Sequence, residues 1–353
     1  MPEPILIGSK DWNVNRLEAL RDGVNPGDGS AADFFRQAIA FLKNASLEFR
    51  TSGTAGKAKE ISLSVETLRT SARRTIDYFG LLPGSRFLLC LPPQYIAGTM
   101  MIVRAAENRG ELTFIPPFSD GLRPDLFRPG EFDLVSLVPS QLRKNPEIGK
   151  WARNLLLGGA PLGDLDVSGL IRAGVRVTET YGMTETASHV ALRDLSRGES
   201  DFRPLPGFRV SLGEGDRLII HGEGLPDGGL ITQDKARLDP DGGFAITGRL
   251  DTLINTGGLK VDPAELEKDL RGGLSGEFCV TSVPDRVLGE ALVVFFAGTP
   301  DTAEGNVPAL RKIKNRHPEW KFSLFYGYGK SLPLTDSGKI IRRLDRFPGI
   351  EKI

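Results

Sequence analysis

The chain of 353 residues is longer than one hydrophobic core usually serves, so two domains are expected. Its hydrophobic fraction of 40% and charged fraction of 25% are ordinary for a globular protein. Its formal net charge of zero argues against broad nucleic-acid binding, which needs a basic face. Two cysteines and three scattered histidines provide no metal-site spacing, and buried reduced thiols are expected.

The N-terminus lacks a basic segment followed by an apolar core, so no secretory signal is expected. No apolar run is long enough to span a bilayer, which argues against membrane insertion. Together with the reduced thiols, these features predict a cytoplasmic protein. The sequence leaves the oligomeric state open, including a homo-oligomer.

Short apolar runs alternate with helical patterns in the first half of the chain. Strands are expected over residues 47–51, 86–92, 111–116, 133–139 and 154–159. Ser64 can cap a helix that Gly80 ends, and a second helix is expected over residues 96–108. This alternation predicts an α/β domain with a mostly parallel sheet covered by helices. Because ligands bind beyond the carboxyl ends of such strands, one site is expected at the loops after Thr51, Leu91, Val138, Leu157 and Val177.

The second half of the chain changes character twice. Residues 208–246 contain a hairpin around Gly213–Asp216 and short strands with glycine-rich borders, which predict a small β-rich layer. Further along, two apolar strands and two short helices that start with proline, Pro263–Leu270 and Pro308–Asn315, predict a small α+β domain. We therefore place the domains at residues 1–249 and 250–353.

The stretch FRTSGTAGKAKE, residues 49–60, has the composition of a phosphate-binding loop. Its glycines let backbone N–H groups approach an anion, its hydroxyls add donors, and its lysines add charge. The P-loop pattern G-x-x-x-x-G-K-[ST] fails, because Gly53 and Gly56 are too close together and Ala58 stands where Ser or Thr should bind magnesium. Taken alone, the stretch is equally consistent with a polar surface turn.

Three more glycine-punctuated segments follow, namely TYGMTETAS (180–188), GRLDTLINTGGLKVDPAELE (248–267) and LPLTDSGKIIRR (332–343). In this order, the four segments resemble the adenylate-forming superfamily of acyl-CoA synthetases, adenylation domains and luciferases. The resemblance runs from Phe49 onward, and residues 1–48 are fewer than most of that family has before the loop. It implies a large N-terminal domain and a small mobile C-terminal one. It also implies an enzyme that uses ATP and Mg²⁺ to adenylate a carboxylate and then forms a thioester with coenzyme A.

The resemblance gives the first two segments roles around ATP. The opening loop would hold the phosphates through Thr51, Ser52, Gly53, Thr54, Gly56, Lys57 and Lys59. Ala55 and Ala58 depart from the family pattern there, which implies weaker phosphate contacts. Tyr181, followed by Gly182, would stack beside adenine. Thr184 would donate to the α-phosphate, and Glu185 would help to hold Mg²⁺ through oxygen ligation.

Asp234 would accept hydrogen bonds from both ribose hydroxyls, although Gln233 replaces the glycine that the family has before it. Arg249 would reach the ribose or the α-phosphate. A surface salt bridge is the alternative for each of these two residues. Asp251 falls on the family's hinge position between the two domains.

The small domain would present two different segments to the site. In the thioester-forming pose, Gly257, Gly258 and Lys260 would face the site and line the path of the pantetheine arm. In the adenylating pose, Lys339 would reach the site, where its ammonium group offsets charge between the attacking carboxylate and the α-phosphate.

The acid pocket is expected at the loops after the central strands. Small residues such as Gly159 leave room for a ring, and polar groups for an anionic acid are offered by Gln94, Tyr95, Ser188, His189 and nearby Arg104. With LPPQYIAGTMMIVRA, LVPSQL and LLLGGAPL, these residues resemble most the o-succinylbenzoate–CoA ligases of menaquinone biosynthesis. Their substrate carries two carboxylates and a benzoyl ring. Arg104 on the outer face of its helix and His189 as a packing residue are the open alternatives.

Other functions stay open at this point. They are another aryl- or acyl-CoA ligase, an adenylation enzyme that loads a carrier protein, and a catalytically silent nucleotide-binding relative. A silent relative would have lost the reactive residues, yet this chain retains Thr184, Glu185, Asp234, Arg249, Lys260 and Lys339.

Overall fold

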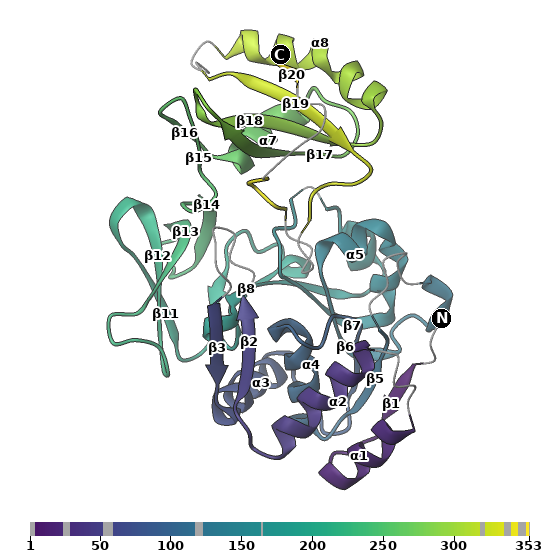
Figure 1. Ribbon diagram of the computed structural model, residues 1–353. Helices are drawn as coiled ribbons and strands as arrows, with labels where there is room; N and C mark the ends of the chain where they lie inside the picture. The colour runs from purple at the N-terminus through teal and green to yellow at the C-terminus, as the bar shows by residue number, and fades with distance from the viewer. Residues whose placement is uncertain are drawn as a thin grey trace.

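The computed structural model describes residues 4–23, 29–51, 59–116, 123–163, 165–317, 322–334, 340–344 and 351–352. Within these ranges the helices are α1 (Val14–Asp22), α2 (Gly29–Leu42), α3 (Val65–Phe79), α4 (Ile96–Asn108), α5 (Pro139–Lys144), α6 (Ser168–Arg172), α7 (Pro263–Arg271) and α8 (Pro300–Arg316). Figure 1 shows how they pack around the sheets.

The largest sheet contains β1 (Ile5–Ile7), β5 (Glu111–Phe114), β4 (Arg86–Leu89), β6 (Phe132–Leu137), β7 (Ala152–Leu157), β8 (Arg176–Met183), β9 (Ser188–Asp194) and β10 (Arg203–Pro204), in that spatial order. Its five central strands, β5, β4, β6, β7 and β8, run parallel, and the edge strands pair antiparallel. The carboxyl ends of the parallel strands therefore meet at one edge. This arrangement confirms the predicted α/β class.

Helices cover both faces of this sheet, because its strands are apolar on both sides. Buried residues from α2 and α4, such as Phe34 and Met101, pack with Phe87 and Phe114 on one face. On the other face Trp151 and its neighbours form a second core under α5 and α6. Such two-sided burial is typical of parallel sheets.

The predicted helix signals act as expected around α3 and α4. Ser64 caps α3, since its hydroxyl accepts a hydrogen bond from the Thr67 N–H at 3.2 Å. Gly80 ends the helix in the left-handed region with φ of 61°. The bounds of α4 coincide with the predicted range of 96–108.

The first predicted strand does not join the parallel sheet. Instead, β2 (Leu47–Thr51) pairs antiparallel with β3 (Lys59–Leu63) in a separate two-stranded sheet. Its sequence alternates, with Leu47 and Phe49 buried and Glu48 exposed, as expected of a strand with only one buried face. Thr51 therefore ends a strand of this separate sheet, and not a strand of the main sheet as expected.

A four-stranded antiparallel sheet follows, with β11 (Phe208–Leu212), β12 (Arg217–Gly222), β13 (Leu230–Leu238) and β14 (Phe244–Arg249). It confirms the predicted β-rich layer, and β11 and β12 form the hairpin predicted around Gly213–Asp216. This layer packs against the main sheet, because its buried residues Leu218, Ile220 and Phe244 pack with Val190 of β9.

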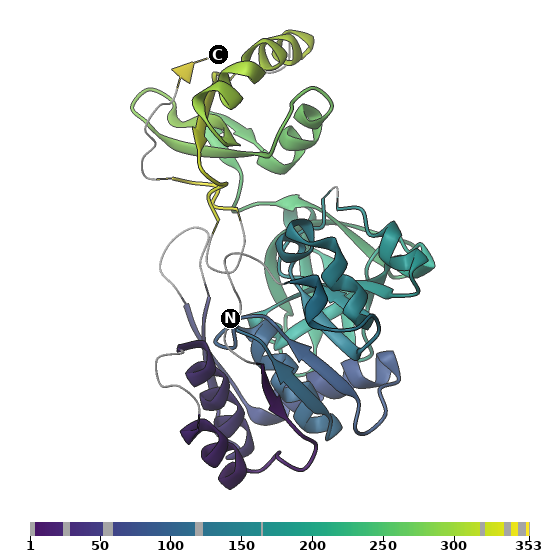
Figure 2. The same cartoon turned by 90° about the vertical axis from the view of Figure 1, so that its right-hand side faces the viewer.

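The last sheet contains β15 (Ile254–Thr256), β16 (Leu259–Val261), β17 (Phe278–Asp285), β18 (Gly289–Ala297), β19 (Leu324–Gly329) and β20 (Glu351–Lys352). Figures 1 and 2 show these strands with α7 and α8 grouped at one end of the molecule. The predicted start of the second short helix is wrong, because α8 begins at Pro300 and Pro308 lies inside it. Proline is favoured at the first position of a helix, and both Pro300 and Pro308 meet that criterion. The sequence alone therefore did not show which of them begins the helix.

Two further observations concern the described residues as a whole. Within them, no helix is long and apolar enough to cross a membrane. Cys90 and Cys279 are both buried and unpaired, as predicted.

Candidate functional site

The loops at the carboxyl edge of the main sheet are tied to one another. The Gln141 amide donates to the Cys90 carbonyl at 2.8 Å and accepts from the Val138 N–H at 3.0 Å, which joins the ends of β4 and β6. Gly158, after β7, lies so close to β8 that an added Cβ would stand 2.2 Å from the Thr180 hydroxyl. The ends of four parallel strands therefore converge on one region.

The turn between β8 and β9 holds the predicted Thr184 and Glu185 in a single 3₁₀ turn, Thr184–Thr186. Its backbone is tightly folded, because a Cβ at Gly182 would lie 2.1 Å from the Ser188 carbonyl oxygen. Ser188 itself has φ of 116°, which is strained for a residue other than glycine. From α3, the Ser71 hydroxyl donates to the Ala187 carbonyl at 2.9 Å and helps to hold this turn.

Arg104 lies inside the molecule, and the outer-face alternative is wrong. Its side chain comes from α4, and the residue is only 2% exposed. The guanidinium Nη2 donates to the Ser188 hydroxyl at 2.9 Å and lies 3.5 Å from His189 Nδ1. Its Nε donates to the Thr75 hydroxyl at 3.1 Å. Among the described residues, no carboxylate forms a salt bridge with Arg104, so this buried cation has only neutral partners.

Burial sets the protonation of this cluster. It lowers the pKa of Arg104 to about 9, which leaves the guanidinium charged at neutral pH. Burial, together with the nearby charge of Arg104, lowers the pKa of His189 well below its ordinary value, so the imidazole is neutral. The cluster of Arg104, Thr75, Ser188 and His189, which we call the Arg104 cluster, thus carries one net positive charge.

A second group of polar residues surrounds Asp234, which is 5% exposed on β13. One carboxylate oxygen accepts a hydrogen bond from the Tyr181 hydroxyl at 2.6 Å, and the other accepts from Arg249 Nη1 at 2.6 Å. Arg249 also forms a bidentate pair with Asp251, at 2.9 Å and 2.8 Å. We call these four residues the Asp234 network. It links the end of β8 to the segment between β14 and β15.

The charges of the Asp234 network stabilise one another. Burial alone would lower the pKa of Arg249, but its pairs with Asp251 and Asp234 raise it. Burial also raises the pKa of Tyr181, and the nearby Asp234 carboxylate adds to that effect. Each carboxylate oxygen has a second lone pair, so Asp234 keeps acceptor capacity for a ligand hydroxyl.

The tyrosine ring has neighbours that the sequence did not predict. Its centroid lies 5.3 Å from the Phe244 ring in an edge-on arrangement and 5.8 Å from the Phe202 ring. These contacts fix the orientation of Tyr181, which is half-buried. Its stacking beside adenine stays a prediction.

One hairpin connects the two groups. Gly182 of β8 pairs directly with His189 of β9, and Tyr181 precedes Gly182 in the chain. The Arg104 cluster and the Asp234 network therefore each include residues of this strand pair, Ser188 and His189 in the first and Tyr181 in the second. Thr184 and Glu185 lie in the turn between them. Sequence reasoning named Arg104, Ser188, His189, Tyr181, Asp234, Arg249 and Asp251 but not Thr75, and their roles stay predictions.

The role of Glu185 toward Mg²⁺ stays a prediction. Its side chain is half-buried and forms no ion pair with another described residue. No group of three or more described His, Cys, Asp and Glu residues could hold a metal by protein ligands alone.

The remaining predicted residues are less closely tied to these groups. Thr51 and Lys59 pair at the end of the β2–β3 hairpin, whereas residues 52–58, and with them Ser52, Gly53, Thr54, Gly56 and Lys57, lie outside the described residues. Lys339 also lies outside them. Gly257 and Gly258 form the turn between β15 and β16, followed by the exposed Lys260. Of the residues predicted for the acid pocket, Gln94 and Gly159 are exposed, and Tyr95 is half-buried at the start of α4.

Sequence reasoning missed Thr75 and Ser71. Both lie on the buried face of α3, where the pattern otherwise places apolar side chains such as Leu68 and Ala72. Two hydroxyls four residues apart on that face were the available signal.

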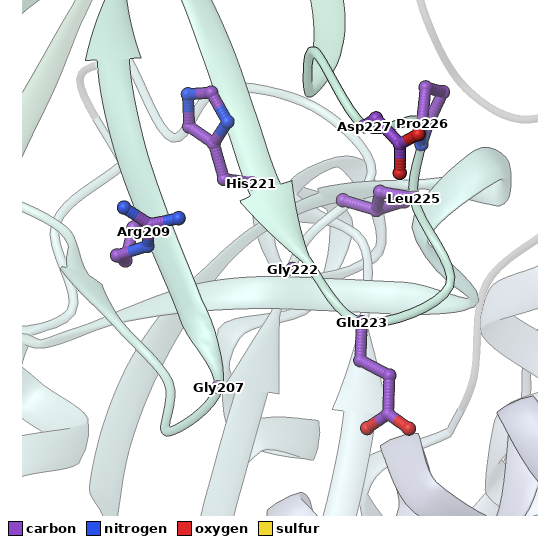
Figure 3. Close-up of a pocket in the computed structure, with 8 residues that line it drawn as sticks. All are labelled: Gly207, Arg209, His221, Gly222, Glu223, Leu225, Pro226 and Asp227. Carbon is purple, nitrogen blue, oxygen red and sulfur yellow. The ribbon is translucent and has the colours of Figure 1, made fainter.

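A surface hollow of about 340 Å³ lies elsewhere, beside the β11–β12 hairpin. Figure 3 shows His221 and Arg209 on neighbouring strands, with Glu223 pointing away from both. His221 is already bonded to the Ser211 hydroxyl at 2.8 Å. The hollow contains none of the predicted site residues, and we assign it no chemistry.

Known proteins share this arrangement of segments. The profile of the AMP-binding enzyme family matches residues 49–224. A probable 2-succinylbenzoate–CoA ligase of Mycobacterium tuberculosis is 31% identical over 82% of this chain, which covers 77% of that protein. The chain belongs to the AMP-binding enzyme family. A feruloyl-CoA synthase of an Amycolatopsis species is 26% identical to this AMP-binding enzyme. The match covers 85% of the present chain and 69% of the feruloyl-CoA synthase.

A solved structure extends the similarity to nearly the full length. It is an acyl-CoA synthetase (AMP-forming)/AMP-acid ligase II-like protein from Dyadobacter fermentans. It is 28% identical, with a TM-score of 0.56, and the match covers 96% of this chain and 97% of that one. The AMP-binding enzyme described here therefore shares its overall fold with a protein of closely similar extent.

Proposed function

We propose that this AMP-forming acid–CoA ligase acts on o-succinylbenzoate, in menaquinone biosynthesis. A carboxylate oxygen of the acid would attack the α-phosphorus of ATP and release pyrophosphate. The sulfur of coenzyme A would then attack the acyl carbon, and AMP would leave. The two reduced, buried cysteines are consistent with a cytoplasmic enzyme.

The buried charge of Arg104 carries the substrate assignment. A buried ion without a partner of opposite charge is costly, so it is retained where a ligand supplies that partner. One carboxylate of o-succinylbenzoate must react with ATP, and the other needs a cation. Arg104 provides it, beside the hairpin that also bears Tyr181. A feruloyl-type acid has no second carboxylate to pair with Arg104.

The Asp234 network would hold the nucleotide. Asp234 would accept hydrogen bonds from the ribose hydroxyls with its remaining lone pairs, and Tyr181 would lie beside adenine. Glu185 would ligate Mg²⁺, and Thr184 would donate to the α-phosphate. Mg²⁺, when bound, supplies positive charge to the phosphate oxygens at which negative charge develops. The loop over residues 51–59 would hold the other phosphates.

The small domain would alternate between two tasks. A boundary between residues 249 and 250, with Asp251 as the hinge, is consistent with the change of sheet between Arg249 and Ile254. The bidentate pair of Arg249 and Asp251 would connect the nucleotide site to that hinge. Lys339 would serve adenylation, and Gly257, Gly258 and Lys260 would serve thioester formation.

A panel of acids tests this function. The enzyme is incubated with ATP, Mg²⁺, coenzyme A and either o-succinylbenzoate, benzoate, ferulate or a fatty acid, and the thioester is identified by mass. We expect o-succinylbenzoyl-CoA at the highest kcat/KM, with AMP released in equal amount. Preferred conversion of a monocarboxylic acid would contradict the substrate assignment. Transfer only to a carrier protein's phosphopantetheine arm, and not to free coenzyme A, would point to a carrier-loading enzyme.

A further inference from the structure

Arg104 is oriented by neutral groups, and the Thr75 hydroxyl holds its Nε atom. That contact, at 3.1 Å, fixes the plane of the guanidinium, because Nε is rigidly joined to both terminal nitrogens. The Ser188 hydroxyl accepts from Nη2 at 2.9 Å. Among the described residues, Nη1 donates only to the Met101 sulfur, at 3.7 Å, which is a weak acceptor. The nitrogen with the poorest protein partner is therefore Nη1.

The hydrogen bonds around Thr75 also assign the tautomer of His189. The Thr75 hydroxyl donates its one proton to the Ser71 carbonyl at 3.2 Å. With that proton so placed, the hydroxyl accepts from Arg104 Nε and from His189 Nε2, the latter at 3.0 Å, which agrees with Arg104 Nη2 being able only to donate toward His189 Nδ1. With its proton on Nε2, neutral His189 presents Nδ1 as an acceptor toward Arg104 Nη2.

We propose that Thr75 is a positioning residue that holds Arg104, directly and through His189, in the orientation that receives the second carboxylate of the acid. This inference rests on the proposed function. A hydroxyl suits the task because it orients the guanidinium without neutralising it. A carboxylate at this position would pair with Arg104 and leave no net charge for the substrate.

The substitution Thr75→Val tests this role, because it keeps the shape of the side chain and removes the acceptor. Misorientation of one charge-assisted contact predicts a rise of about 10-fold or more in KM for o-succinylbenzoate, with kcat close to that of the wild type. The inhibition constant of benzoate, which lacks the second carboxylate, is expected to stay unchanged. Thr75→Ser is expected to restore the KM, since it returns the hydroxyl.

Thr178→Val is the matched control. Thr178 is a fully buried threonine on β8 whose hydroxyl has no hydrogen-bond partner in the described structure. The same loss of a hydroxyl there is expected to leave both constants unchanged. If Thr75→Val does not fold, Thr75→Ala is used for the same comparison, with the melting temperature measured beside the kinetics.

The outcomes separate this inference from the proposed function. If the wild type forms no thioester from o-succinylbenzoate, the proposed function fails and this inference with it. If the wild type does so but Thr75→Val leaves its KM unchanged, or weakens benzoate equally, only the positioning role is wrong.

Discussion

Lys339→Ala is expected to lower carboxylate-dependent pyrophosphate release by about 10²–10³, the usual effect of removing one preorganised donor from a transition state. Thioester formation from supplied acyl-adenylate should remain close to that of the wild type. The reason is that Lys339 is predicted to offset charge only while the carboxylate attacks the α-phosphate. The two half-reactions are measured separately, by pyrophosphate release and by thioester mass.

The described residues that follow Lys339 in the sequence are attached to the C-terminal sheet. The Arg342 guanidinium pairs with buried Glu267 and donates to the Val280 carbonyl at 2.7 Å. The next residue, Arg343, donates to Glu290 at 2.8 Å and to the Leu253 carbonyl at 3.0 Å. These contacts attach residues 340–344 to the sheet that contains β17 and β18.

Lys330→Ala is the control, because Lys330 is an exposed lysine just beyond β19. It should change neither half-reaction. Equal losses in both half-reactions for Lys339→Ala, or no loss in either, would contradict the assigned role.

Arg104→Leu is the second substitution with a large expected effect. Removal of one partner from a buried charge pair typically costs about 3–5 kcal/mol, which corresponds to at least 10²-fold in affinity. We therefore expect KM for o-succinylbenzoate to rise by about 10²–10³. The KM of Arg104→Lys should lie between those of the wild type and Arg104→Leu, because lysine keeps the positive charge but lacks the planar guanidinium.

Stability provides a second measurement on the same variant. In the free enzyme, Arg104 is buried with no carboxylate partner among the described residues. Its replacement by leucine removes an unpaired buried charge, so the melting temperature should not fall. A protein that loses affinity for the diacid without losing stability has lost a ligand contact. A large loss of stability, with benzoate binding weakened as strongly, would show that Arg104 serves the core instead.

Local signals predicted much of the fold. The range of α4 and the cap of α3 follow from short-range patterns, because periodicity and capping depend on residues a few positions apart. The parallel sheet follows from its continuous apolar strands. The antiparallel pairing of β2 with β3 was not predicted, because the pairing partners of a strand depend on tertiary packing.

The site was predicted unevenly for the same reason. Tyr181 and Asp234 were recognised from family segments, but their hydrogen bond joins residues 53 positions apart. The contact between Arg104 and Ser188 spans 84 positions. Nothing local distinguishes an inward-facing Arg104 from a surface arginine. Thr75 was missed because its pairing with Ser71 on one helix face does not reveal its distant partners, Arg104 and His189.

Transfer of ¹⁸O tests most directly the claim that this enzyme joins an acid to AMP. o-Succinylbenzoate labelled in its carboxylates is converted with ATP, Mg²⁺ and coenzyme A, and the released nucleotide is analysed by mass. Attack of the carboxylate on the α-phosphorus predicts one ¹⁸O in each AMP. Unlabelled AMP, or ADP with labelled inorganic phosphate, would contradict it.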